Sequence, residues 1–179
     1  MYQARIAARD ILGQAHEPAS YRALPRVTFT DPEVGAVGLT EAQARRRDVT
    51  VRTAVSQIPS SSRGWIHGPG NDGFIKLIAD AGAGVLIGAT SAGPAGGEVL
   101  GALAVAVHAQ VPVTLLSQMI YAYPTFHRAI EDGIAQLSLR RPDRIKTRAA
   151  ALLAGLASAI YQPRSSSAAR IAAGSVRLL

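Results

Sequence analysis

The stretch GFIKLIADAGAGVLIGAT, residues 73–90, decides the class of fold. Residues 73–79 are rich in apolar side chains, and residues 85–90 repeat that character after a turn-like Asp-Ala-Gly-Ala-Gly. This pattern predicts two antiparallel strands joined as a β-hairpin. The glycine spacing comes close to a dinucleotide-binding fingerprint, but a strand rather than a helix follows it, so the hairpin is favoured.

Further strands are expected before this hairpin. Alternating apolar and polar residues predict strands over 25–30, 34–39 and 49–58, and Asp31-Pro32-Glu33 interrupts the chain between the first two. Short connections between successive strands favour antiparallel pairing. The sequence therefore predicts a mainly antiparallel sheet of four to five strands.

Helices are predicted around these strands, over residues 40–47 with Thr40 as N-cap, over 98–110 and over 112–121, and Thr125 can cap a last helix. The segment 98–110 is apolar nearly all round, which is typical of a buried helix. The fold class is therefore α+β, with helices packed on the sheet. A helical tail is expected at the C-terminus, with a separate helix over residues 143–160.

The net positive charge of the 179-residue chain comes entirely from this tail. The net charge is +7, and residues 139–179 hold eight basic side chains against Asp143, so residues 1–138 are neutral overall. A nucleic-acid surface on the folded body is thereby disfavoured, because it would need a basic face there. A contact of the basic tail with nucleic acid or an acidic membrane remains open as an alternative.

Several classes of site are excluded by composition. The chain has no cysteine, so disulfides and thiolate metal sites cannot form within it. Its four histidines share no ligand spacing, and no metal site is expected.

No stretch resembles a signal peptide or a membrane span, so a cytoplasmic protein is expected. Residues 1–12 resemble a helix without an N-terminal cap, which fits either a frayed end or missing upstream sequence.

Two loops could bind an anion. Residues 60–63, Ser-Ser-Ser-Arg, stand near Trp65 and His67 and could hold phosphate, but a flexible surface loop is the favoured interpretation. Residues 93–97 are rich in glycine and precede a helix, where free N–H groups could bind an anion. Close packing of helix on sheet is favoured there instead.

The segment Tyr123-Pro124-Thr125 is a third candidate. An aromatic residue before proline raises the chance of a cis peptide bond, although trans is the expected isomer. His127 and Glu131 follow at helical i, i+4 spacing and could form an acid–base pair. A solvent-exposed ion pair between them is the favoured interpretation.

The order of these motifs resembles the C-terminal dimerisation domain of the class I pyridine nucleotide–disulfide oxidoreductases. That family includes dihydrolipoamide dehydrogenase, glutathione reductase and mercuric reductase. The matching pieces cover about residues 2–138. They are YQARIAARDILG at 2–13, PRVTFTDPE at 25–33, VGLTE at 37–41, GFIKL at 73–77, VLIG at 85–88, GEV at 97–99 and YPT at 123–125.

The resemblance implies a division of the chain. Residues 1–13 would end a helix leaving a missing FAD domain, residues 14–138 would be the dimerisation domain, and residues 139–179 a basic, partly disordered tail. The chain would be a truncated fragment or a split subunit. Its partner would be a second copy or a flavin-domain subunit. FAD and NAD(P)H would be bound mainly elsewhere, with no tight binding expected here and no activity of the chain alone.

The resemblance also implies a changed active-site loop. The family carries a His-Pro-Thr-x-x-Glu motif, whose histidine is an acid–base serving the partner subunit's disulfide. Here Tyr123 stands at the histidine position and Arg128 at the glutamate position, so the dyad is absent. Tyr123, Pro124 and Thr125 would then contact the cofactor, and no catalytic residue is assigned. A stand-alone homodimerisation module without redox activity is the alternative.

Overall fold

The computed structural model describes residues 1–139, and the predicted helix over 143–160 lies outside them. The elements are, in order, α1 (Tyr2–Ile11), β1 (Pro25–Thr28), β2 (Glu33–Gly38), α2 (Glu41–Arg45), β3 (Val51–Gln57), α3 (Ser62–His67), β4 (Phe74–Asp80), β5 (Val85–Gly93), α4 (Gly96–His108), α5 (Val113–Leu116) and α6 (Arg128–Leu139). The expected α+β class is confirmed.

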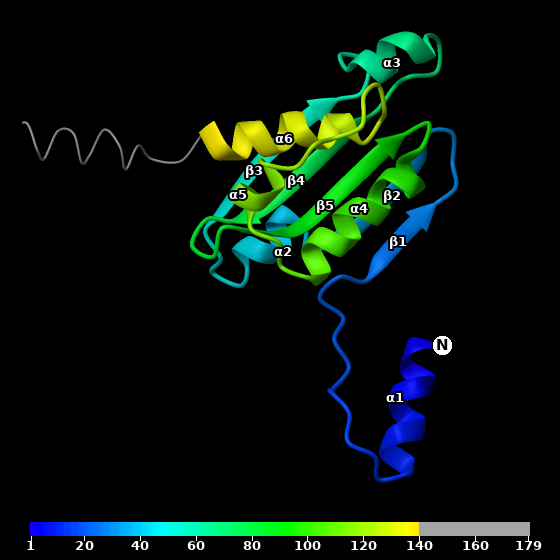
Figure 1. Ribbon diagram of the computed structural model, residues 1–179, viewed down its shortest axis with the longest axis vertical. Coiled ribbons are helices and arrows are strands. Elements are labelled where there is room, and N and C mark those ends of the chain that lie inside the picture. The colour runs from blue at the N-terminus through cyan, green and yellow to red at the C-terminus, as the bar shows by residue number, and fades with distance from the viewer. Residues whose placement is uncertain (140–179) are drawn as a thin grey trace, which may run out of the picture. The chain divides into compact units, whose positions relative to one another are not determined.

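The five strands form one antiparallel sheet in the order β1-β2-β5-β4-β3 (Figure 1). The hairpin β4–β5 lies at its centre, as residues 73–90 predicted. A carboxylate oxygen of Asp80 accepts hydrogen bonds from the N–H groups of Gly82 and Ala83, at 2.7 and 3.0 Å. The glycine-rich stretch is therefore a turn rather than a dinucleotide fingerprint.

The core lies between one face of the sheet and two helices, α4 over β2 and β5 and α6 over β3 and β4 (Figure 1). Strand side chains alternate between faces, so Ile75 and Leu77 of β4 point into this core and are fully buried. The helices contribute further buried side chains, namely Val99, Leu100, Leu103, Val107, Ile130, Ile134 and Leu137. Burial of each such side chain contributes about 1.5–3 kcal/mol to folding.

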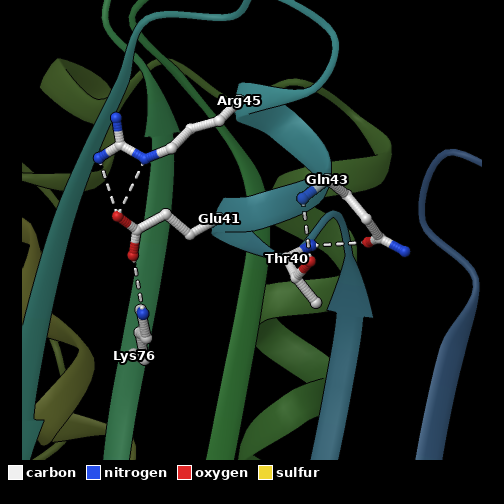
Figure 2. A network of polar contacts seen from close by, with 5 residues as sticks. All are labelled: Thr40, Glu41, Gln43, Arg45 and Lys76. Carbon is white, nitrogen blue, oxygen red and sulfur yellow. Dashed lines mark hydrogen bonds and ion pairs between the residues drawn. The ribbon is translucent and has the colours of Figure 1, made fainter.

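An ion pair connects the opposite face of the sheet to α2. Lys76 alternates with Ile75 and Leu77 and so points to that face, where its ammonium lies 2.9 Å from Glu41 Oε2. Arg45 holds the other oxygen of Glu41 at 2.9 Å (Figure 2). Both hydrogen bonds, led by the one from Arg45, lower the pKa of Glu41 below its ordinary value.

The sequence of α2 also explains where this helix begins. Thr40 and Gln43 form a capping box, in which the Thr40 hydroxyl accepts from the Gln43 N–H and the Gln43 side chain accepts from the Thr40 N–H (Figure 2). Two N–H groups that the first turn would leave without partners are satisfied. The predicted cap at Thr40 is confirmed.

Close packing explains the glycines at the start of α4. A Cβ atom at Gly96 would lie 2.5 Å from the carbonyl oxygen of Glu33. The next N–H, that of Gly97, donates to Glu33 Oε2 at 2.9 Å. A carboxylate of β2 therefore caps α4, whose own N-cap residue Ala95 supplies no side-chain bond. The packing interpretation of residues 93–97 is confirmed.

Two expectations are wrong, the length of one helix and the absence of another. The helix expected over 112–121 is only α5, because hydroxyl bonds such as Ser117 Oγ to the Thr114 carbonyl compete with helix continuation. The last helix begins at Arg128, and the predicted cap Thr125 accepts a hydrogen bond from the Arg128 N–H at 3.3 Å. The surface loop expected around residues 60–63 contains the start of the helix α3, which Ser61 caps by accepting from the Gly64 N–H at 3.0 Å.

Among residues 1–139, no helix is long and apolar enough to cross a membrane. Over the same residues, no group of three or more histidine and acidic side chains could hold a metal ion.

Candidate functional site

A large apolar cavity lies between α4, α5 and the chain leading to α6. Its volume is about 570 Å³. The lining is almost wholly aliphatic, with Leu86, Ala102, Leu103, Val105, Ala106, Val111, Leu115, Leu116, Met119, Tyr121 and Ile130 beside a single amide, Gln118. A cavity with so few polar groups suits an apolar occupant.

Exposed apolar side chains line this cavity, and a further one, Ile120, follows Met119 in the chain. Ile120 is 96% exposed and Val105 65%, and Leu115 and Met119 are about half exposed. An isolated exposed leucine needs no explanation, but a continuous group of such residues marks an interaction site. We call the exposed residues Ala102, Val105, Leu115, Met119 and Ile120 the α4–α5 face.

Tyr121 closes the inner side of the cavity. Its ring is buried, and its hydroxyl donates to the Leu116 carbonyl at 3.2 Å. Burial raises the pKa of Tyr121, and the nearby negative charge of Glu131 adds to the effect. The phenol is therefore held in its neutral form and acts as a structural donor rather than as a base.

The loop of Tyr123, Pro124 and Thr125 lies directly before α6. The Tyr123–Pro124 peptide bond is cis, so the expectation of a trans bond is wrong. The Thr125 hydroxyl donates to the Ala122 carbonyl at 2.7 Å and accepts from the Arg128 N–H at 3.3 Å. These bonds fix the loop at the start of α6 and leave the Tyr123 ring 67% exposed.

Arg128 organises the charges beside this loop. Its guanidinium lies 5.8 Å from the centre of the Tyr123 ring and 2.8 Å from Glu131 Oε2. The first contact is within the range of a cation–π interaction. The expected pairing of His127 with Glu131 is wrong, because Arg128 at i, i+3 reaches the carboxylate.

The helix α3 packs against the start of α6, which the sequence did not predict. The Arg63 guanidinium lies 5.4 Å from the centre of the Phe126 ring, and the His67 ring meets the same ring edge-on at 5.7 Å. The side chains proposed as phosphate ligands therefore contact an aromatic ring. Neither a phosphate loop nor a flexible loop describes residues 60–67, since Ser61 is buried and caps α3.

The fit of a flavin can be tested on the same loop. Neither the apolar cavity nor a second cavity of about 450 Å³ is lined by Tyr123, Pro124 or Thr125. The polar atoms of Thr125 are satisfied within the loop. The loop therefore does not enclose a flavin by itself. Its exposed Tyr123 and Pro124 and half-buried Thr125 leave it able to contact only a flavin held by another part.

Comparison with known proteins assigns this fold. The family model "Pyridine nucleotide-disulphide oxidoreductase, dimerisation domain" matches residues 24–133. Dihydrolipoyl dehydrogenase of Haloferax volcanii is 33% identical over 131 residues, which are 72% of this chain and 26% of that protein. A mercuric reductase of Shewanella putrefaciens is 37% identical over 102 residues, 57% of this chain and 18% of that protein. The chain thus spans about a quarter of the relatives' length.

Solved structures of similar proteins agree with this family assignment. LpdA from Mycobacterium tuberculosis superposes with a TM-score of 0.68 at 29% identity, covering 75% of this chain and 29% of that chain. The flavoprotein disulfide reductase RclA from Escherichia coli gives 0.65 at 22% identity, covering 73% and 30%, a likeness of fold alone. The chain belongs to the pyridine nucleotide–disulfide oxidoreductase family, and residues 24–133 are its dimerisation domain.

Proposed function

We propose that this chain is the homodimerisation domain of an FAD- and NAD(P)H-dependent flavoprotein, and that the α4–α5 face is where two copies meet. The family to which the chain belongs is FAD- and NAD(P)H-dependent. The flavin and the nicotinamide are bound by a larger part, carried by the same polypeptide or by a separate subunit. The observation that carries the proposal is the group of exposed apolar side chains around the apolar cavity.

The chemistry of the α4–α5 face supports a second copy as its occupant. The members of the face are aliphatic or thioether side chains, and a charged or polar ligand would leave them in contact with water. Two copies of one chain associate most often about a two-fold axis, which brings the same patch of each copy together. An apolar patch is complementary to itself, whereas a patch of one charge is not.

The loop at Tyr123 supports a particular kind of parent enzyme. By resemblance to the family motif, Tyr123 and Arg128 replace the histidine and glutamate of the acid–base dyad. A phenol is a weaker general base than an imidazole at neutral pH, so thiol–disulfide chemistry is not supported. We assign Tyr123, Pro124 and Thr125 to contact with a flavin of the dimer. We assign a quinone, a dye or a metal ion as the class of electron acceptor of the parent enzyme.

A cross-linking experiment tests the interface. Because the chain has no cysteine, a single cysteine can report on one surface. We expect Val105→Cys, on the α4–α5 face, to give a covalent dimer with a short bismaleimide at low protein concentration. The matched control is Ala135→Cys on the outer side of α6, which is expected to stay monomeric under denaturing conditions. Equal cross-linking of the two variants, or none of either, would contradict the proposed interface.

A further inference from the structure

The second cavity of the domain, of about 450 Å³, lies at the opposite end of β5 from the Tyr123 loop. It is bounded by the segment before β1, the end of β2, the turn after α2, the start of β5 and the end of α4. Its volume is within the range of small-molecule sites. None of its lining residues is acidic, although the body of the chain has as many acidic as basic side chains.

Two arginines line this cavity, and among residues 1–139 neither has a counterion. Arg22 comes from the connection between α1 and β1, and Arg47 from the turn after α2. Within residues 1–139, neither side chain forms an ion pair or a hydrogen bond, in contrast to Arg45 and Arg128. Both residues are exposed, so they place two positive charges beside one cavity that no acidic residue lines, and this favours a bound anion.

The two arginines are not needed to neutralise the partial negative charge at the C-terminal end of a helix. Arg47 follows a helix of five residues, whose last turn already holds Arg45. The partial negative charge of so short a helix is small. At the end of α4 the final carbonyls accept hydrogen bonds from the N–H groups of Ala109, Gln110 and Val111, so they need no cation.

The segment that carries Arg22 is fixed by contacts of the residues before and after it. The next residue, Ala23, packs against the hydrophobic core. The preceding residue, Tyr21, also lines the cavity, and its hydroxyl accepts from Gln3 of α1 at 3.0 Å. The Tyr2 ring meets the Tyr21 ring edge-on at 6.4 Å. The cavity is therefore built by contacts from three separate parts of the chain.

We propose that this cavity binds an organic phosphate, a phosphate monoester that carries an apolar or aromatic group. A monoester is close to a dianion at neutral pH, so it neutralises both Arg22 and Arg47, whereas a monocarboxylate leaves one charge uncompensated. Gln110, which also lines the cavity, carries an amide that can donate to the phosphate. Leu39, Ile87 and the Tyr21 ring supply the surface for the apolar group. The site is separate from the α4–α5 face and does not depend on dimerisation.

Calorimetric titration of the full 179-residue chain with phenyl phosphate tests this site. We expect saturable one-to-one binding, at least about tenfold tighter than that of inorganic phosphate, and none of benzyl alcohol. Arg22→Gln and Arg47→Gln are each expected to weaken binding about tenfold or more. The matched control is Arg46→Gln, which removes the same charge from the same turn but lies outside the cavity. It is expected to bind as the parent chain does.

Three results would overturn the proposal. These are equal weakening by Arg46→Gln and Arg47→Gln, unchanged binding in the Arg22→Gln/Arg47→Gln double variant, and equal affinity for inorganic and phenyl phosphate. The basic residues 140–179 are present in every variant, so their nonspecific attraction for phosphate cancels in each comparison. Amide chemical shifts of the parent chain give a readout that needs no variant. Phenyl phosphate should move Leu39, Ile87 and Gln110, and movement confined to other residues would contradict the site.

Discussion

The helices α4 and α6 cover the same face of one sheet, and their outer surfaces differ. Both direct large aliphatic side chains inward, such as Leu103 from α4 and Ile134 from α6, and these are fully buried. Outward, α6 presents Glu131, Asp132 and Gln136, as a helix next to water should. Outward, α4 presents Glu98 and His108 near its two ends and Gly101, Ala102 and Val105 between them.

This difference separates two uses of apolar residues. The inner residues of both helices stabilise the fold of a single chain. The outer residues of α4 contribute nothing to that core, since Val105 is 65% exposed. The apolar middle of the outer surface of α4 therefore indicates a partner.

The largest effect is expected at the inner faces, where the helices should behave alike. Leu103→Ala and Ile134→Ala each delete a fully buried side chain, and each should lower the free energy of unfolding by about 2–5 kcal/mol. Urea denaturation followed by circular dichroism measures both. A cost below about 1 kcal/mol at either position would show that its helix is not part of the core.

A smaller effect is expected where α4 meets the sheet. Gly96→Ala places a Cβ atom 2.5 Å from a backbone oxygen of Glu33, and should cost about 1–3 kcal/mol. Gly101→Ala, on the outer side of the same helix, meets nothing within 4 Å and should gain up to about 1 kcal/mol. Thermal unfolding of the two variants gives shifts of opposite sign; shifts of the same sign would contradict this packing.

The remote cap of α4 is expected to matter less. Glu33→Ala removes the carboxylate that accepts from the Gly97 N–H and should cost about 1 kcal/mol. Glu33→Gln keeps an acceptor oxygen but loses the charge, so it should recover part of that stability. Urea denaturation at low and high salt measures the difference. An alanine variant as stable as the parent would show that α4 does not need this cap.

The smallest effect is expected at Glu41, on the other face of the sheet. Its pKa is lower in the folded than in the unfolded chain, so its contribution to stability is present above its ordinary pKa and is lost as pH falls through the folded value. Glu41→Gln should therefore reduce stability at pH 7 and flatten the acid limb of the stability profile. An unchanged profile between pH 7 and pH 3 would contradict the ion pairs with Arg45 and Lys76.

Much of the fold follows from local sequence. The hairpin at residues 73–90 and the cap at Thr40 depend on turn and capping residues within a few positions, and both were predicted. The helix α3 was not predicted, since its stabilising contacts with Phe126 join residues about sixty positions apart. The end of α5 was also missed, because hydroxyl groups there compete for backbone carbonyls.

The site was less predictable than the fold. The spacing of His127 and Glu131 suggested a pair, but helix geometry allows i, i+3 as well as i, i+4, and Arg128 is the stronger competitor. The apolar character of residues 98–110 was read as burial, whereas one side of α4 is exposed. Hydropathy alone cannot distinguish a residue that faces its own core from one that faces a partner.

Sedimentation equilibrium of the purified chain tests the central claim most directly, which is that the outer surface of α4 is an interface between two copies. We predict a monomer–dimer equilibrium in the parent chain. Val105→Glu should weaken that equilibrium at least about a hundredfold, because it buries an unpaired charge. Ala135→Glu on α6 should leave it unchanged. A parent chain that stays monomeric at high concentration, or equal association of all three proteins, would contradict the account.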